Sequence, residues 1–206
     1  MADAPETLPD DLRATVARLW DIQQIKDLAH RYAVGVDQRD LDALVALYVD
    51  DVRAARLPDG TLLTGRAALK DTFDESLRAI GVSILFVGNH VIDFEGDAGG
   101  SPDRARGIVY CRGLIQDGDR VVEQAIQYRD VYERRDGRWL FVRRVHVLWW
   151  GVETAERPYA LPPANWPEHH DGLGTVPYDV PSWQAFWGGP GRGPQDGGPD
   201  RPGTGG

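Results

Sequence analysis

The second half of the chain constrains its fold most, because it contains four long extended segments in succession. Glycine-rich connections separate them, and Asp117-Gly118-Asp119 and Asp136-Gly137 are typical of hairpin turns. Strands joined by such short turns run antiparallel. The sequence therefore predicts a four-stranded antiparallel meander. Its strands are expected at Val82 to Phe94, Ala105 to Gln116, Arg120 to Glu133 and Arg138 to Trp150.

Helical periodicity precedes these strands. Apolar residues recur at steps of three and four from Ile22 to Val36, which predicts a long helix with one buried face and Asp21 as its N-cap. The stretch from Leu12 to Trp20 predicts a shorter helix before it. Asp40 is expected to cap a second helix that contains Leu41, Leu44, Val45 and Tyr48.

A short hairpin and a third helix are predicted between the second helix and the meander. The hairpin comprises Val52 to Leu57 and Thr61 to Thr64, and the helix runs from Arg66 to Ile80 until Gly81 ends it. Helices followed by a long antiparallel meander are typical of an α+β fold, not of a doubly wound α/β fold.

Composition and charge exclude several classes of function. The net charge of −9 disfavours nucleic-acid binding, which requires a basic face. Cys111 is the single cysteine, so neither an internal disulfide nor a cysteine zinc cluster can form. Residues Met1 to Asp10 do not resemble a secretory signal, and no apolar run is long enough to span a membrane. We expect a cytoplasmic protein without membrane or nucleic-acid partners.

The sequence divides into four regions. Residues 1–11 are expected to be flexible, and residues 12–150 to form the folded domain. Residues 151–187 form an arm rich in proline and aromatic rings, which we expect to lie against the body or a partner. Residues 188–206 consist mostly of Gly, Pro, Asp and Arg and are expected to be disordered.

Three strings carry a resemblance to a known family. IQQIKDLAHRYAVGVDQRDLDALVALYVDD, residues 22–51, resembles the opening of the SnoaL-like branch of the nuclear-transport-factor-like superfamily. YRDVYERRDGRWLFVRRVHVLWW, residues 128–150, resembles its last hairpin, and VGN, residues 87–89, its first long strand. The resemblance implies a cone-shaped α+β fold in which a curved antiparallel sheet wraps around the long N-terminal helix. It also implies an internal pocket and dimerisation through the sheet.

The resemblance assigns catalytic candidates to this pocket. It places Asp37 where dehydratase members keep a pocket aspartate, and Tyr32 and Arg144 where relatives keep a pocket tyrosine and arginine. A carboxylate in a partly dry pocket gains basicity by desolvation. His146 lies two residues after Arg144 and shares its strand face, whereas Arg143 faces the other way.

One departure from the family pattern affects the chemistry. The dehydratases have a histidine four residues before the asparagine of VGN, and this sequence has Leu85 there. The other polar dehydratase position falls near Val109 or Cys111, so the usual Asp-His dyad is absent from its usual place. His146 could compensate, whereas His90 is expected to face outward beside Asn89.

Further side chains are expected to line the pocket or to be inert. His169 and His170 are interpreted as solvated, since no third ligand at useful spacing accompanies them, and we expect neither a metal nor a cofactor. The expected lining residues are Tyr48, Leu85, Asn89, Val109, Cys111, Tyr128 and Leu148.

The resulting hypothesis is a cofactor-independent proton-transfer enzyme, either a dehydratase-like lyase or an isomerase or cyclase. Its substrate is expected to be a small, mainly apolar cyclic molecule of polyketide or steroid type. Asp37 would be the base or its orienting partner and His146 a second titratable group, while Tyr32, Tyr128 and Arg144 would bind developing negative charge. The alternatives are a non-catalytic ligand-binding domain, in which Leu85 marks lost catalysis, and an epoxide hydrolase.

Overall fold

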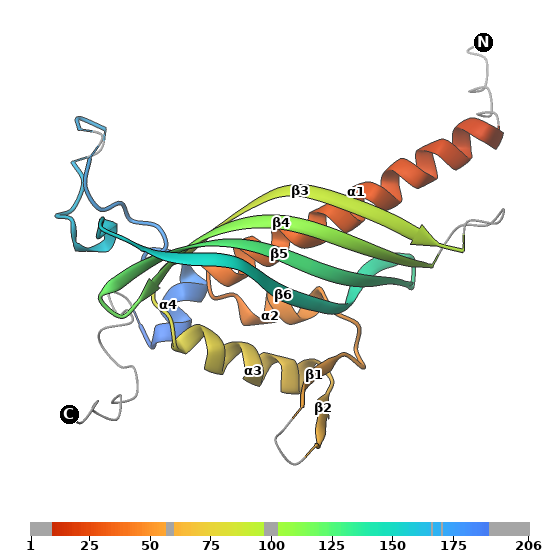
Figure 1. Cartoon of the computed structure of the whole chain (residues 1–206), viewed down its shortest axis with the longest axis horizontal. Helices are drawn as coiled ribbons and strands as arrows, with labels where there is room; N and C mark the ends of the chain where they lie inside the picture. Colours follow the sequence, from red (N-terminus) through yellow and green to blue (C-terminus); the bar gives the residue numbers. More distant parts are fainter. Residues whose placement is uncertain (1–9, 57–59, 97–102, 166, 170, 190–206) are drawn as a thin grey trace, which may run out of the picture.

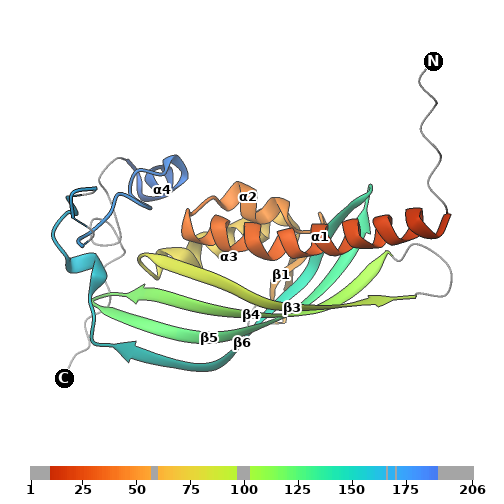
Figure 2. The ribbon, with the colours of Figure 1, turned by 90° about the horizontal axis from the view of Figure 1, so that it is seen from above.

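A four-stranded sheet covered on one face by helices forms the body of the molecule (Figures 1 and 2). The computed structural model describes residues 10–56, 60–96, 103–165, 167–169 and 171–189. The strand order is β3-β4-β5-β6 with antiparallel neighbours, which confirms the predicted meander and the α+β class. The strands are β3 (Ser83–Glu95), β4 (Arg104–Asp117), β5 (Arg120–Arg135) and β6 (Arg138–Thr154).

One long helix, α1 (Asp10–Asp37), lies across the covered face of the curved sheet. The predicted separate lead-in helix and the Asp21 N-cap are both wrong, because the helix passes through this position without a break. Asp21 is instead buried, and it accepts hydrogen bonds from Trp139 Nε1 at 2.8 Å and Arg134 Nη1 at 3.1 Å. Its carboxylate therefore ties the middle of α1 to the β5–β6 hairpin.

The end of α1 is a Schellman turn. Asp40 N–H donates to Gly35 O at 3.0 Å and Arg39 N–H to Val36 O at 3.2 Å, with Arg39 in the left-handed conformation at φ 58°. Asp40 then caps α2 (Leu41–Ala46) by accepting from Ala43 N–H at 2.9 Å, as predicted. This turn directs the side chain of Arg39 into the interior, where it is 2% exposed.

The predicted hairpin and third helix are confirmed as β1 (Arg53–Arg56), β2 (Leu62–Thr64) and α3 (Arg66–Arg78). Residues 57–59 of the predicted turn lie outside the described residues. Gly81 does not end α3, which ends at Arg78 with Ala79 as a C-cap in the right-handed conformation. A Cβ at Gly81 would lie 2.5 Å from the side chain of Gln116, which would have to move to admit it.

The C-terminal arm packs against the body, as predicted, through α4 (Pro181–Trp187), which follows a short 3₁₀ turn (Pro158–Ala160). Trp183, Phe186 and Trp187 are buried there in one cluster with residues of α1, α2 and α3. Trp166 and residues 190–206, which include most of the predicted disordered tail, lie outside the described residues. Within the described part of the chain, no helix is both long and apolar enough to cross a membrane.

Candidate active site

Asp37 is the last residue of α1, and its carboxylate reaches the start of β3. Oδ1 accepts a hydrogen bond from Ser83 Oγ at 3.1 Å, and Oδ2 accepts one from the Leu85 backbone N–H at 3.0 Å. Each oxygen therefore has one protein donor and retains a further lone pair for another proton. Asp37 is partly buried, so its carboxylate is neither fully enclosed nor pointed into bulk water.

The buried Arg39 guanidinium supports the Ser83 hydroxyl. Arg39 Nη1 donates to Ser83 Oγ at 3.0 Å, and the same guanidinium also donates to the backbone oxygens of Val36 and Gly81. Because Ser83 Oγ accepts from Arg39, its own proton is directed to Asp37. The order of donation is therefore Arg39 to Ser83 to Asp37.

Burial makes Asp37 unusually basic. It raises the pKa of the Asp37 carboxyl from its ordinary 3.8 to about 6, although the Leu85 N–H, the Ser83 hydroxyl and the Arg39 charge each lower it. At pH 7 most of the group is ionised, and its proton affinity is close to that of an ordinary histidine. A general base works best when its pKa lies near the working pH.

A second buried carboxylate, Asp130 of β5, is paired with Arg144 of β6. Arg144 Nε donates to Asp130 Oδ1 at 2.9 Å and Nη2 to Oδ2 at 2.7 Å, and the two side chains are 3% and 0% exposed. Burial alone lowers the pKa of Arg144, but the hydrogen bonds and charge of Asp130 outweigh it and raise that pKa. Arg144 thus faces inward as predicted, while Arg143 is exposed.

Tyr132 and His90 extend this pair. Tyr132 Oη donates to Asp130 Oδ2 at 2.8 Å and lies 3.0 Å from His90 Nε2. Since the only Tyr132 hydroxyl proton goes to Asp130, His90 Nε2 must be the donor, which leaves Nδ1 as an acceptor. Burial lowers the pKa of His90 to about 4, so the ring is neutral at pH 7.

His90 does not face outward, and this prediction is wrong. A bulge in β3 lets Val87 pair with Cys111 and His90 with Val109, so three steps on β3 match two on β4. The extra residue reverses the alternation, so that His90 turns inward. Asn89 is exposed and borders an outer hollow, which contradicts its expected place in the pocket.

Aromatic rings cover the Arg144 guanidinium. Its Cζ lies 4.3 to 4.5 Å from the ring centroids of Tyr32, Tyr128 and Phe141. Burial raises the pKa of both Tyr32 and Tyr128, so both phenols remain protonated at neutral pH. Arg144 Nη1 is buried and has no hydrogen-bond partner among the described residues.

An apolar cluster connects the Asp37 and Arg144 ends of the site. Val109, Cys111 and Tyr128 are buried in it, and Tyr32 and Leu85 pack against it, so most predicted lining residues share the inner face. Tyr48 is buried in an adjoining cluster against Phe141. Burial raises the pKa of the Cys111 thiol to about 11, which fits a small buried apolar group.

His146 lies at the border of the site. It pairs with Tyr128 across β5 and β6, so it shares the inner face, and the two ring centroids are 5.6 Å apart. Its side chain is nevertheless exposed on the edge strand, as is Leu148. Burial lowers the pKa of His146. The described residues show no hydrogen bond or ion pair between His146 and Asp37, so a direct dyad between them stays a prediction.

Besides His90, four polar residues of the site were not among the predicted site residues, namely Arg39, Ser83, Asp130 and Tyr132. Asp130 and Tyr132 follow Tyr128 at steps of two, so strand alternation would have placed them on the inner face. Arg39 and Ser83 gave no such signal, because their meeting depends on the turn after α1. Within the described residues, no group of three His, Cys, Asp or Glu side chains could hold a metal, and His170 lies outside them.

Comparison with known proteins identifies the family. A family model described as the SnoaL-like domain matches residues 17–145, more than half of the 206-residue chain. The chain belongs to the SnoaL-like family. This confirms the resemblance seen in the sequence. The arm that carries α4 lies after the matched part of this SnoaL-like protein.

The similar proteins include hexachlorocyclohexane dehydrochlorinases. Hexachlorocyclohexane dehydrochlorinase 1 of Sphingobium indicum is 27% identical over 132 residues, which cover 59% of this SnoaL-like chain and 77% of that protein. The structure of the dehydrochlorinase LinA type 2 has 26% identity and a TM-score of 0.57, and covers 68% of this chain and 93% of its own. A scytalone dehydratase-like structure from Novosphingobium aromaticivorans, with 23% identity and a TM-score of 0.56, covers 69% and 93% and supports the fold alone.

Proposed function

We propose that this SnoaL-like protein is a cofactor-independent proton-transfer enzyme, a lyase or an isomerase or cyclase. Asp37 is the general base, and the substrate is a small, mainly apolar cyclic molecule with an acidic C–H next to a carbonyl or a similar group. The family supports a fold that processes small molecules without a cofactor. The site geometry supports the finer assignment.

The partly buried Asp37 carboxylate is the observation that carries this proposal. Its pKa of about 6 provides a base that is ionised at pH 7 and still able to hold a proton. In the proposed step, Asp37 takes the acidic proton and the electron pair of the C–H bond moves onto the activating oxygen. Return of the proton to another carbon gives an isomer, whereas loss of a leaving group gives elimination.

Hydrogen-bond donors on the inner face would stabilise the substrate oxygen that becomes negative in this step. The phenols of Tyr32 and Tyr128 stay protonated, and Arg144 Nη1 is a further donor without a partner among the described residues. Donors held ready for developing charge lower the barrier without reorganisation. The Arg144 charge itself is matched by Asp130, which favours an uncharged substrate over an anionic one.

Water addition to an epoxide is the weaker alternative. It would need a carboxylate free to activate water, and Asp130 is the inner-face candidate beside an arginine. Both Asp130 oxygens already accept from Arg144, and Oδ2 also accepts from Tyr132. The paired Asp130 is therefore a poorer base than Asp37, and hydrolysis by this carboxylate is disfavoured.

Solvent-deuterium exchange tests the proposed function. A panel of enolisable cyclic ketones and polyketide-like phenols is incubated with the protein in D₂O, and incorporation is followed by mass spectrometry or NMR. Asp37→Asn is expected to slow exchange by about 10²- to 10⁴-fold, because the general base is lost. Asp93→Asn, at an exposed position of β3, is the matched control and should exchange like the wild type.

Two outcomes would oppose catalysis by Asp37. Exchange that persists unchanged in Asp37→Asn would remove the proposed base. Saturable binding of panel members without any deuterium incorporation would support the alternative of a passive ligand-binding domain.

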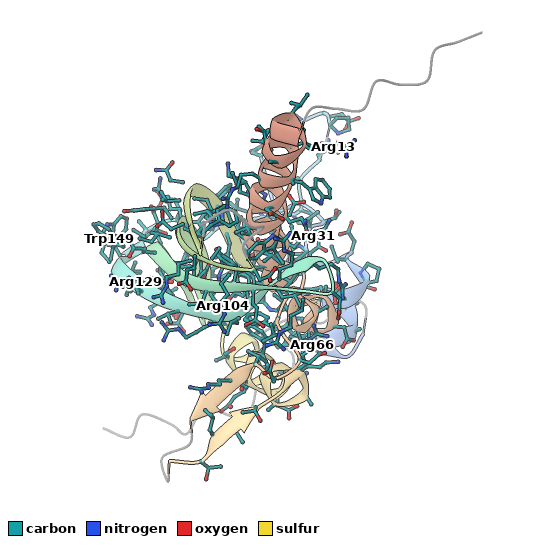
Figure 3. The ribbon with its side chains drawn as sticks, turned by 90° about the vertical axis from the view of Figure 1, so that its right-hand side faces the viewer. Arg13, Arg31, Arg66, Arg104, Arg129 and Trp149 are labelled. Carbon is teal, nitrogen blue, oxygen red and sulfur yellow. The ribbon has the colours of Figure 1, made fainter. Side chains whose placement is uncertain are left out.

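We also propose that two copies associate through the outer face of the sheet. Trp149 and Arg129 project from the side of the sheet away from α1 (Figure 3). Phe86 and Trp149 are 59% and 61% exposed there, and they border an outer hollow with Tyr110. Exposed apolar patches of this kind mark interaction sites. Light scattering should give twice the monomer mass for the wild type and the monomer mass for Trp149→Glu.

A further inference from the structure

Helix α4 belongs to the arm, after the part of the chain that matches the family. Figure 2 shows it in the helical layer, beside the end of α1. Its aromatic side chains Trp183, Phe186 and Trp187 are 0%, 8% and 8% exposed. This segment is therefore an integral part of the packed body at the end where Asp37 lies.

A continuous series of contacts leads from α4 to the Asp37 carboxylate. The Trp183 ring centroid lies 4.9 Å from Arg39 Cζ, in a cation–π contact. Arg39 Nη1 donates to Ser83 Oγ, which donates to Asp37. Ser182 Oγ also donates to the backbone oxygen of Gln38, the residue after Asp37, at 2.8 Å.

The same helix provides apolar cover for this end of the site. Trp183 belongs to a buried cluster with Val36 and Leu44, against which Tyr32 and Leu85 of the inner site also pack. The Nε1 groups of Trp183 and Trp187 have no hydrogen-bond partner among the described residues. Apart from the Ser182 hydrogen bond and the Arg39 contact, the helix therefore meets the body mainly as apolar surface, which excludes water.

We propose that Trp183 of α4 is part of the active site, where its ring covers the Arg39 end of the Arg39–Ser83–Asp37 contacts and shields the Asp37 carboxylate from water. The proposal rests on the proposed function of Asp37 as the base. Trp183 lies in the arm, after the residues that match the family, whereas Asp37 lies within them. A residue of the arm would therefore influence the basicity of a residue of the family domain.

Few charged groups act on Asp37, which makes the effect of α4 separable. Arg39 comes from the turn after α1, and Cys111 of β4 is near enough to sense the Asp37 charge. From β3, the Ser83 hydroxyl and the Leu85 N–H donate to it. Helix α4 has the sequence PSWQAFW and carries no titratable side chain. Any influence of α4 must therefore pass through burial or through the position of Arg39.

The test is a ¹³C NMR titration of the Asp37 carboxyl in full-length variants. Trp183→Leu is expected to lower the pKa of Asp37 by on the order of one unit, because water reaches the carboxylate. Ser83→Ala is expected to raise it by a similar amount, because the carboxylate loses a donor. Phe186→Leu is the matched control on the same helix, since its ring lies 4.3 Å from Arg78 Cζ instead of Arg39, and should titrate as the wild type.

A downward shift in Trp183→Leu together with an upward shift in Ser83→Ala supports shielding by Trp183, because loss of the Arg39–Ser83 contacts would raise the pKa of Asp37 in both variants. Should Trp183→Leu not fold, Trp183→Phe is expected to shift the titration downward by a smaller amount. Folded Trp183 variants that titrate like the wild type would overturn the proposal and leave the proposed function intact. A wild-type pKa near 4 would overturn both.

Discussion

Asp130 and Asp37 both lie on the inner side of this sheet, the first buried and the second partly buried, and their surroundings differ in kind. Asp130 is matched by a guanidinium with two hydrogen bonds and accepts a third from Tyr132. Among the described residues, Asp37 has a backbone N–H and a hydroxyl as its only direct donors, and burial raises its pKa to about 6. The same functional group is thus a paired structural charge in one place and, in our proposal, a base in the other.

The difference between Asp130 and Asp37 follows from whether a cation is in direct contact with the carboxylate. A buried ion pair contributes little net stability, but breaking it is costly because one charge is left uncompensated. A buried carboxylate without a cation in direct contact is less stable in its charged form than it is in water. Its pKa is therefore raised, and the group is a stronger base. The Asp130–Arg144 pair is therefore a structural element of the interior, while Asp37 keeps the raised proton affinity on which the proposed function depends.

The largest expected effect comes from breaking the pair. Asp130→Asn leaves the Arg144 guanidinium buried without its counter-charge and should destabilise the protein by about 3–5 kcal/mol at pH 7. Urea unfolding followed by circular dichroism measures this loss. Asp93→Asn on the exposed face is the control, and it should change stability by less than about 0.5 kcal/mol. A loss no larger than that of the control would show that the pair is not the structural element described.

The same substitution at Asp37 is expected to act in the opposite direction. The folded-state pKa of about 6 exceeds the ordinary 3.8, so the folded protein binds this proton more tightly than the unfolded chain. The stability that this proton contributes is fully present below pH 3.8 and is lost as the pH rises through 6. Asp37→Asn cannot ionise, so it should stabilise the protein at pH 7 by up to about 3 kcal/mol.

This gain should disappear near pH 4, where the wild-type carboxyl is protonated as well. Thermal unfolding of the wild type and Asp37→Asn at both pH values checks it. Destabilisation at pH 7 would mean that the Leu85 and Ser83 hydrogen bonds outweigh the cost of burial.

The smallest expected change in stability comes from Gly107, which lies beside Tyr132 and His90, the two residues that extend the Asp130 pair. A Cβ added at Gly107 would lie 2.7 Å from Tyr132 Oη and 3.1 Å from His90 Nε2. Gly107→Ala should therefore destabilise the protein by about 1–3 kcal/mol through overpacking. Gly151→Ala is the matched strand control, because its nearest neighbour would be 3.6 Å away. Equal losses in both variants would indicate a general glycine effect and no specific contact.

The sequence predicted the fold well because the meander and the first helix have strong local signals. It missed the continuity of α1, since Asp21 looks like an N-cap until its partners Arg134 and Trp139, more than 110 residues away, are known. It also reversed His90, because the bulge at β3 adds one residue to a strand that otherwise alternates. Gly88 inside that strand was the available signal for a bulge.

The site was predictable in part, because local sequence patterns indicate some of its residues, whereas others meet only through contacts between distant parts of the chain. Asp37, Tyr32, Tyr128 and Arg144 follow from helix and strand periodicity combined with the family pattern. The inner-face position of Asp130 would have followed from the same alternation, but it was not predicted, and the sequence alone did not reveal that Asp130 pairs with Arg144. The contact of Arg39 with Trp183 joins residues 144 positions apart, and no local pattern indicates it.

The dependence of deuterium exchange on pH tests the central claim most directly. With a responsive substrate from the panel, the rate should rise with pH along a limb whose midpoint lies at about 6, because only ionised Asp37 accepts the proton. The limb should be absent from the residual rate of Asp37→Asn. A wild-type rate that is flat from pH 5 to 8, or a limb that persists in Asp37→Asn, would contradict the assignment of Asp37 as the base.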